Sequence, residues 1–240
     1  IGDIDLLVAG DAPALARRMA RDLGGSVGVL DGQAGVARVA FGDQIFDFAT
    51  LQAATVEDDL RARDFTINAL AAPATPAHLR ALAAGESAPL RAAVIDPTGG
   101  LADLGDRHSC LSTEDRHSCL STRLRMTSAT ALRDDPVRLL RAARFAVALD
   151  GTIEDATIAA AREVAPLLDA TAPERWLAEL YAMLAGHNGT RAMRLLDDLG
   201  ALTVLVPPLI PCRGLVQGRL HYWDVFEHTL EVMDAVDHVV

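Results

Sequence analysis

Aromatic side chains are scarce in this sequence of 240 residues, which contains 2 Trp, 2 Tyr and 6 Phe. β-Sandwiches and barrels are enriched in aromatic and β-branched residues, so this scarcity argues against them. Ala, Leu and Arg recur instead, and these residues favour helices. Because 50% of the residues are apolar, the chain can bury a substantial core in one large domain or two small ones.

Long apolar runs and a cysteine framework are also missing. No apolar segment approaches the roughly 20 residues that a membrane span requires, and no charged segment followed by an apolar core opens the chain. The 3 cysteines, two of them inside a repeat, do not suggest a disulfide framework. We therefore expect a cytoplasmic protein with no membrane partner.

Positive charge is in deficit, since 33 acidic residues stand against 22 basic ones and the formal net charge is -11. Proteins that bind nucleic acid usually carry a basic surface. Any such surface must therefore be local, with the arginine-rich segment 133–144 as the candidate, or lie in a part of the protein that is not present. The chain begins at Ile1 without a methionine and stops inside a predicted helix, which indicates a fragment.

The first 104 residues are predicted to form a small mixed α/β head. Short alternating patterns bounded by glycines predict strands, and longer patterns at helical spacing predict helices. Gly42 and Asp43 suit a hairpin turn between two strands. The predicted strands are 3–9, 27–30, 37–41, 44–49 and 93–95, and the predicted helices are 13–23 and 56–72.

Residues 124–205 read as a helical neck. Glycine, asparagine or proline separates its predicted helices, which are 136–149, 154–168, 173–185 and 190–199. A linker rich in proline and glycine then leads to a last helix near Trp223, within a C-terminal segment 206–240. The expected fold class is α+β, a small head followed by an all-helical neck.

Between head and neck, residues 105–123 contain the tandem repeat DRHSCLSTE and DRHSCLST. The repeat has no apolar periodicity, so we interpret it as an inserted flexible loop. Its two histidines and two cysteines, His108, Cys110, His117 and Cys119, could form a tetrahedral zinc site. The loop interpretation is preferred, because duplication alone produces this symmetry.

Asp3 and Asp5 form a candidate metal site. Residues two apart in a strand point to the same face, so these carboxylates project side by side while Ile4 turns toward the core. Paired carboxylates suit Mg²⁺. A solvated strand end is the alternative, and it holds for most isolated pairs of this kind.

Asp47 is the best candidate for a third carboxylate. The rings of Phe46 and Phe48 must both face away from it, which leaves the acid on the opposite side of the strand. An acid there is costly unless it faces a cleft or binds a cation. An edge-strand aspartate facing water is the alternative.

The segment RDFTINALA, residues 63–71, carries a second group of polar residues. On a helix, Asp64 and Asn68 stand one turn apart on one face. They could meet ribose hydroxyls or fix the loop, and Arg63 is placed to reach a triphosphate. Taken alone, Arg63 and Asp64 could equally be a surface ion pair.

The segment DDPVRLLRAARF, residues 134–145, carries a third group. Asp134, Asp135, Arg138 and Arg141 occupy positions at which neighbours three and four apart share a helix face. A carboxylate accepts from an exocyclic amine and an arginine donates to ring acceptors, so Asp135 with Arg138 could admit C and A while rejecting U and G. The alternative is a solvated helix with internal ion pairs.

These two segments, with DPTGGLADL at 96–104 between them and GDIDLLV at the start, resemble the class II tRNA nucleotidyltransferase and poly(A) polymerase family. The resemblance spans nearly the whole chain. It implies a template-independent enzyme that adds C and A to the 3′ end of tRNA from CTP and ATP. Mg²⁺ would be held by Asp3 and Asp5 with Asp47, and would lower the pKa of the attacking 3′-hydroxyl and neutralise the leaving pyrophosphate.

The resemblance also implies roles for the other signatures. Arg63, Arg138 and Arg141 would bind the nucleotide, and Asp135 with Arg138 would select the base. The family commonly has Glu then Asp at the acidic pair, so Asp134 is a departure of one methylene that affects its reach.

Further positions follow the same resemblance. Gly99 and Gly100 would form a hinge between head and neck. Arg175 and Glu179, one helical turn apart, match a later motif with a supporting role. His228, in HYWDVFEHTLEVMD, matches the first metal ligand of an HD-type phosphohydrolase domain, whose His-Asp pair would lie beyond Val240.

Several alternatives stay open. Poly(A) polymerases and enzymes that add only A or only CC share all these motifs. A second class is an HD-type RNA-linked phosphohydrolase whose head is not catalytic. A third is a non-catalytic remnant, because the family's Gly-Gly-x-x-Arg turn would precede Ile1; a truncated sequence is the preferred explanation. Weak, salt-sensitive tRNA binding is expected.

Overall fold

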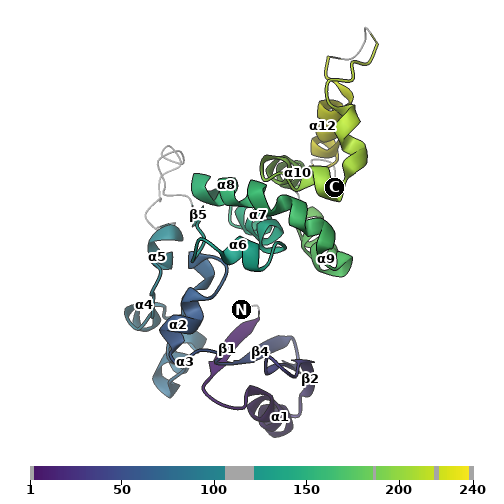
Figure 1. Ribbon diagram of the computed structural model, residues 1–240. Coiled ribbons are helices and arrows are strands. Elements are labelled where there is room, and N and C mark those ends of the chain that lie inside the picture. The colour runs from purple at the N-terminus through teal and green to yellow at the C-terminus, as the bar shows by residue number, and fades with distance from the viewer. Residues whose placement is uncertain (1–2, 106–121, 186–187, 219–221, 238–240) are drawn as a thin grey trace. The chain divides into compact units, whose positions relative to one another are not determined.

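The computed structural model describes residues 3–105, 122–185, 188–218 and 222–237. They divide into two compact units, Ile1–Asp59 and Leu60–Val240. Both units are seen in Figure 1. The α+β class predicted from the sequence is confirmed, since one small sheet precedes a long series of helices. Within the described residues, no helix combines the length and apolar character needed to cross a membrane.

The first unit is a four-stranded sheet with one helix on it. Its elements are β1 (Ile4–Val8), α1 (Ala12–Leu23), β2 (Ser26–Asp31), β3 (Val36–Phe41) and β4 (Gln44–Thr50). The strand order is β1-β4-β3-β2, with β1 parallel to β4 and the other pairs antiparallel. The predicted hairpin turn is present between β3 and β4, where Gly42 has a positive φ of 56°.

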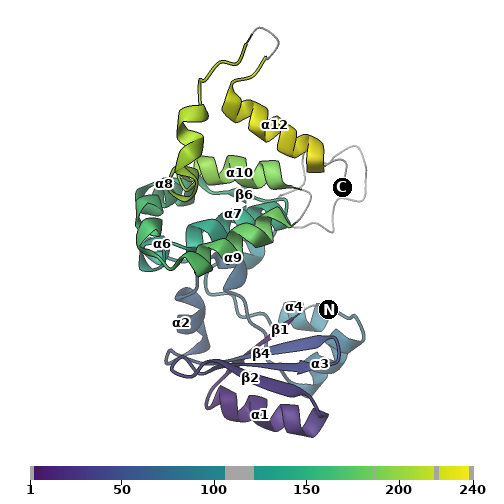
Figure 2. The ribbon, with the colours of Figure 1, turned by 90° about the vertical axis from the view of Figure 1, so that its right-hand side faces the viewer.

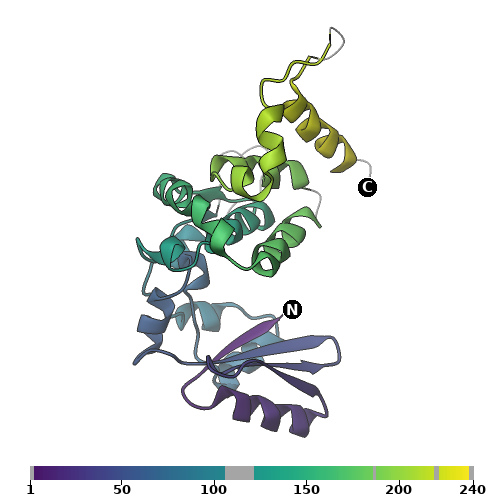
Figure 3. The same ribbon diagram turned by 45° about the vertical axis from the view of Figure 1, so that its right-hand side comes forward.

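Helix α1 covers one face of this sheet, as Figure 2 shows and Figure 3 shows from a second side. Asp11 caps the helix by accepting a hydrogen bond from the Ala14 N–H, and Gly24 ends it in the left-handed conformation. Alanines at positions 12, 16 and 20 form its buried face and pack against Ala37, Val39 and Phe48. Small residues at this spacing let the helix lie close to the strands, which leaves the opposite face of the sheet for polar side chains.

The second unit is mostly helical. Its elements up to residue 105 are the end of α2 (Val56–Arg61), the 3₁₀ helix η1 (Thr66–Asn68), α3 (Pro76–Ala83), α4 (Ala88–Ala92) and α5 (Gly100–Asp103). From residue 122 onward come β5 (Arg123–Leu124), α6 (Ala131–Asp134), α7 (Arg138–Ala148), β6 (Thr152–Ile153), α8 (Asp155–Val164), η2 (Ala165–Ala170), α9 (Pro173–Leu184), α10 (Gly189–Asp198), α11 (Leu202–Leu205), η3 (Pro207–Cys212) and α12 (Val225–Asp237).

Helix α7 forms the centre of the second unit. Leu139, Leu140, Ala142, Ala143 and Ala146 are all fully buried on it. Helices α9 and α10 pack against α7, and α12 packs against α10. The four long helices predicted from 136 to 199 are confirmed within two residues at each end, except that 165–168 is 3₁₀ rather than α-helical.

Two predicted elements were wrong. The single helix expected over 56–72 ends at Arg61, and only Thr66–Asn68 is helical after it. Phe65 is extended, with φ −124° and ψ 149°, and forms a β-bridge with Met126. This tertiary pairing replaces the helical hydrogen bonds that local propensity favoured. The strand expected over 93–95 is reduced to one bridge between Ala71 and Ile95.

We expect Gly100→Ala to destabilise the second unit. A Cβ at position 100 would lie 1.9 Å from the backbone oxygen of Thr66, so the backbone must shift. The expected loss is about 1–3 kcal/mol, typical of overpacking. Both tryptophans lie in the second unit, so urea unfolding followed by tryptophan fluorescence reports on it. Gly218→Ala, with no atom within 4 Å of its Cβ, is the control, and equal midpoints for the two variants would contradict the prediction.

Candidate functional site

The open face of the sheet brings Asp5 and Asp47 together. Asp5 on β1 is the register partner of Asp47 on β4, and Asp47 is in turn the register partner of Arg38 on β3. Register partners share a face, so these three side chains project from one side of the sheet. Phe48 is buried against α1 on the other side, as the alternation in this strand predicted.

Arg38 binds both carboxylate oxygens of Asp47. Its Nε donates to Oδ1 at 2.7 Å and its Nη2 donates to Oδ2 at 2.6 Å. The hydrogen bond to Asp47 and then the charge of Asp47 raise the pKa of the Arg38 guanidinium, with smaller contributions from the charges of Asp3 and Asp5. The sequence analysis missed Arg38; the only local signal was its place on the same face of a neighbouring strand.

The acidic residues fit a divalent cation only in part. Asp3 and Asp5 are exposed, and their carboxylates supply the hard oxygen donors that Mg²⁺ prefers. Across the parts of the chain that the structure describes, no three His, Cys, Asp or Glu side chains form a metal-binding group. Both oxygens of Asp47, the expected third carboxylate, are bound to Arg38.

In the second unit, Asp64 is buried, and both of its carboxylate oxygens accept hydrogen bonds. Its side chain is 6% exposed, its Oδ1 accepts from the Phe65 N–H at 2.8 Å and from Asn68 Nδ2 at 3.3 Å, and its Oδ2 accepts from Arg141 Nε at 2.7 Å. Of the two roles predicted for Asp64 and Asn68, these contacts match the one that fixes the loop. Arg63 Nη1 lies 3.5 Å from the Asn68 carbonyl oxygen.

Arg141 extends this network to α9. Its Nη1 lies 3.7 Å from Glu179 Oε1, and Arg144 Nε donates to Glu179 Oε2 at 2.6 Å. Both guanidinium groups also lie over the ring of Phe145, at 5.4 and 4.3 Å from its centroid. Arg141 is therefore held by a carboxylate on each side and by an aromatic face.

The expectation that the acidic pair shares a helix face with Arg138 and Arg141 was wrong for both acids. Asp134 ends α6, and Asp135 is extended with φ −148° and ψ 99°. Of the four residues in this group, only Arg138 and Arg141 lie on α7. Pro136 explains the break, because a residue that precedes proline is disfavoured in the helical region.

Asp135 is paired with Arg175 of α9 rather than with Arg138. Arg175 Nη2 donates to Asp135 Oδ2 at 2.6 Å, whereas Arg138 Nη1 donates to the Ala131 carbonyl oxygen at 3.1 Å. Asp134 is exposed and accepts from the Thr130 hydroxyl at 3.0 Å. Arg175 was expected only as a supporting residue, and its partner, 40 residues earlier in the chain, could not be read from helix spacing.

Gly99 and Gly100 lie in a turn that several hydrogen bonds hold in place. Gly99 has a positive φ of 80°, and Asp96 accepts hydrogen bonds from four backbone N–H groups at residues 98–101. Burial opposes ionisation of Asp96, but these four donors outweigh it and lower its pKa. The hinge role of the two glycines stays a prediction, and in this conformation the turn is anchored by its own hydrogen bonds.

Asp103, seven residues after Asp96, is buried and also accepts several hydrogen bonds. It accepts from the Thr66 hydroxyl at 2.7 Å, from Arg123 Nη2 at 2.8 Å and from Arg125 Nε at 3.0 Å. Burial would raise the pKa of this carboxyl, but the hydrogen bonds from Thr66, Arg123 and Arg125 lower it below 3.8. Asp103 thus ties the strand after the repeat to the RDFTINALA segment.

The other candidate metal ligands gain no support. His108, Cys110, His117 and Cys119 lie outside the described residues. His228 is half-buried on α12, where its backbone N–H donates to the Asp224 carbonyl oxygen. Its role in an HD-type site stays a prediction.

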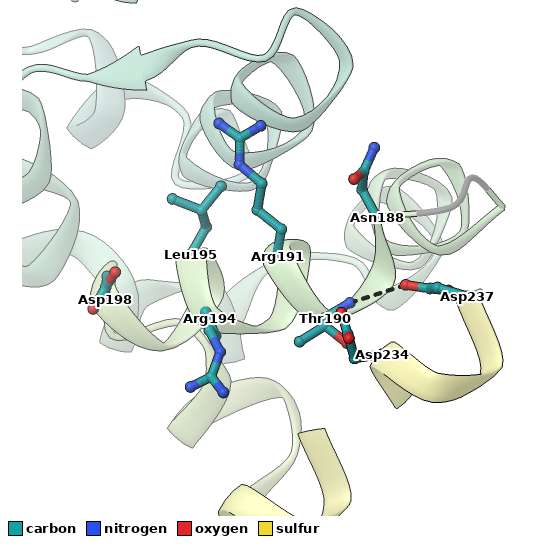
Figure 4. Close-up of a pocket in the computed structure, with 8 residues that line it drawn as sticks. All are labelled: Asn188, Thr190, Arg191, Arg194, Leu195, Asp198, Asp234 and Asp237. Carbon is teal, nitrogen blue, oxygen red and sulfur yellow. Dashed lines mark hydrogen bonds between the residues drawn. The ribbon is translucent and has the colours of Figure 1, made fainter. Parts of the chain in front are cut away.

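A pocket of about 400 Å³ lies between α10 and α12 (Figure 4). Both arginines on its walls have partners within the chain: Arg191 pairs with Asp150 at 2.5 Å, and Arg194 pairs with Glu227 at 3.0 Å. Asp237 Oδ2 accepts from the Gly189 N–H at 2.8 Å. None of the predicted site residues lines this pocket. The lining residues are Asn188, Thr190, Arg191, Arg194, Leu195, Asp198, Asp234 and Asp237.

We expect Asp64→Asn to destabilise the second unit by about 2–4 kcal/mol, because it removes the charge that pairs with Arg141 while the site stays buried. Urea unfolding followed by tryptophan fluorescence measures the effect. Asp169→Asn, at an exposed position of the same unit, is the control. Similar losses for both variants would show that the Asp64 network contributes nothing specific.

Acid unfolding tests the lowered pKa of Asp103. A folded-state pKa below the ordinary 3.8 gives stability that is present above that value and is lost as the pH falls through the lowered pKa. Asp103→Asn should therefore be less stable at pH 7 but should lose less stability between about pH 4 and pH 2. Parallel pH curves for the urea midpoints of wild type and variant would contradict this.

Two protein-family models match the chain. The model described as "Poly A polymerase head domain" matches residues 1–109, and the model described as "Probable RNA and SrmB- binding site of polymerase A" matches residues 151–212. The chain is 38% identical over 228 residues to an A-adding tRNA nucleotidyltransferase of Deinococcus radiodurans, covering 93% of this chain and 45% of that protein.

A CC-adding tRNA nucleotidyltransferase of Geobacter sulfurreducens is 39% identical over 184 residues, covering 76% of this chain and 36% of the relative. The chain thus spans less than half the length of these two relatives. A solved tRNA nucleotidyltransferase, complexed with a primer tRNA and an incoming ATP analog, superposes with a TM-score of 0.66 at 25% identity, over 96% of this chain and 57% of that one. With two family models in the expected order and relatives of one kind, the chain belongs to the tRNA nucleotidyltransferase and poly(A) polymerase family.

Proposed function

We propose that this protein transfers nucleotides from CTP and ATP to the 3′ end of tRNA without a template, and that it completes the CCA sequence. The observation that carries the proposal is the hydrogen bond between Asp64 and Arg141, 77 residues apart in the chain. This contact joins the RDFTINALA and DDPVRLLRAARF segments into one arrangement of polar groups. The relatives, an A-adding and a CC-adding tRNA nucleotidyltransferase, support the same reaction class.

Asp3 and Asp5 would hold Mg²⁺, with Asp47 as the third carboxylate once its oxygens are available. When bound, the cation would activate the terminal 3′-hydroxyl of the tRNA and neutralise charge on the triphosphate. Arg63 would bind the triphosphate through its guanidinium group. Because Asp64 is buried, it would act by positioning Arg141 and Asn68 rather than by touching the nucleotide.

Base selection would depend on Asp135 and Arg138. Asp135 Oδ2 is taken by Arg175, and among the residues that the structure describes Oδ1 accepts one long bond of 3.3 Å, from the Val137 N–H. That oxygen could accept from the exocyclic amine of cytosine or adenine, which uracil and guanine lack at the matching position. Arg138 would donate to the neighbouring ring acceptor, and Asp134 would lie beside this pair.

Addition of A alone is the second candidate, because the Deinococcus relative that covers 93% of this chain is named an A-adding enzyme. The base-reading groups described above accept both bases, so they do not separate the two activities. The two activities are separated instead by offering tRNAs that end in different nucleotides.

The test supplies the intact protein with Mg²⁺, tRNA transcripts that end before CCA, after C or after CC, and each labelled triphosphate in turn. We expect ordered uptake of C, C and A. Asp3→Ala and Asp5→Ala should each lower the rate by more than about 100-fold, since even indirect partners of a metal site contribute 10–100-fold. Asp22→Ala, an exposed acid on α1, is the control.

Uptake of ATP alone would move the assignment to an A-adding enzyme or poly(A) polymerase. Uptake of CTP alone would indicate a CC-adding enzyme. If the intact protein incorporates none of the four triphosphates, the proposed function is wrong.

A further inference from the structure

The contact between Arg38 and Asp47 has a geometry that bears on metal binding. The guanidinium fork meets the carboxylate with two bonds of 2.7 and 2.6 Å, so both acceptor oxygens are used. Asp47 is also the register partner of Asp5, on the face where Asp3 and Asp5 are exposed. A cation bound by Asp3 and Asp5 would therefore compete with Arg38 for the third carboxylate.

We propose that Arg38 is a positioning residue that holds Asp47 until a divalent cation binds at Asp3 and Asp5, and then yields Asp47 to that cation. This inference rests on the metal site of the proposed function. It adds a residue that none of the sequence motifs contains, and it assigns that residue a role before the nucleotide arrives.

Electrostatics gives the reason for such a counter-ion. Carboxylates at neighbouring positions of a sheet repel one another when no cation is bound, and directly opposed like charges destabilise the pairing. Arg38 lies beside Asp47 and contributes the positive charge that offsets this repulsion. A divalent cation offsets it more strongly, because it carries two charges and binds carboxylate oxygens directly.

The structure leaves Arg38 able to move. Its side chain is 43% exposed, while its neighbours Ala37 and Val39 are fully buried against α1 and anchor the strand. Gly28 is the register partner of Arg38 on β2, and no atom lies within 4 Å of the position that its Cβ would occupy. The guanidinium group therefore has open space beside it on the same face, and it can leave Asp47 without disturbing the backbone ladder.

The test measures Mn²⁺ binding to the intact protein by electron paramagnetic resonance, without nucleotide or tRNA. Arg38→Gln should bind Mn²⁺ about three- to fivefold more tightly, since a partly exposed ion pair of ordinary strength no longer has to break. The variant should also melt at a lower temperature without Mn²⁺ and gain more on its addition. Arg17→Gln removes the same charge from the exposed side of α1, on the other face of the sheet, and should leave the affinity unchanged.

The double variant Arg38→Gln with Asp47→Asn separates a specific release from a general change of charge. If Arg38 acts through Asp47, the gain in affinity disappears when Asp47 is already an amide. An unchanged affinity in Arg38→Gln, or the full gain in the Asp47→Asn background, would overturn the inference. Asp3→Asn and Asp5→Asn test the metal site itself: if neither weakens Mn²⁺ binding, the proposed site fails, whatever Arg38 does.

Discussion

The buried carboxylate of Asp64 is the interaction on which the arrangement of the second unit depends. A charge at this depth is stable only when its oxygens are fully hydrogen-bonded, and a backbone N–H, an amide and a guanidinium group supply those bonds. The bond to Arg141 fixes residues 63–68 against α7, and Arg141 passes the constraint to Glu179 on α9. Arg144 adds a shorter bond of 2.6 Å to the same Glu179, so ionic contacts that begin at Asp64 connect three segments that are distant in sequence.

The chain contains no lysine, so arginine accounts for all 22 of its Lys and Arg charges. Its planar fork binds two carboxylate oxygens or bridges two partners, which lysine cannot do with the same geometry. Much of the positive charge is consequently used inside the fold. Within the segment 133–144, Arg133 lies 3.6 Å from Glu163, and Arg141 and Arg144 pair with acids of the core network. The basic surface expected there is therefore largely neutralised in this conformation.

The sequence analysis succeeded where one local period dominates. Helices from α7 to α10 follow an apolar repeat over three or four turns, and β4 alternates clearly enough to place Phe48 against α1 and Asp47 on the opposite face. It failed at residues 62–65, where helix propensity is outweighed by the burial of Phe65 and its bridge to Met126. It also failed at the acidic pair before Pro136, where a single proline interrupts a pattern that otherwise reads as one helix.

The catalytic and binding roles of the candidate acids and arginines stay predictions. The structure shows ionic partners for three of these acids that the sequence analysis did not predict. Asp47 binds Arg38, Asp135 binds Arg175 and Asp64 binds Arg141, over separations of 9, 40 and 77 residues. Periodicity and motif order were sufficient for the class of fold, the two faces of β4 and the family. The choice of ionic partner was made only in the folded chain, because an ion pair depends on which side chains reach the same few ångströms of space, and that distance is set by packing between elements.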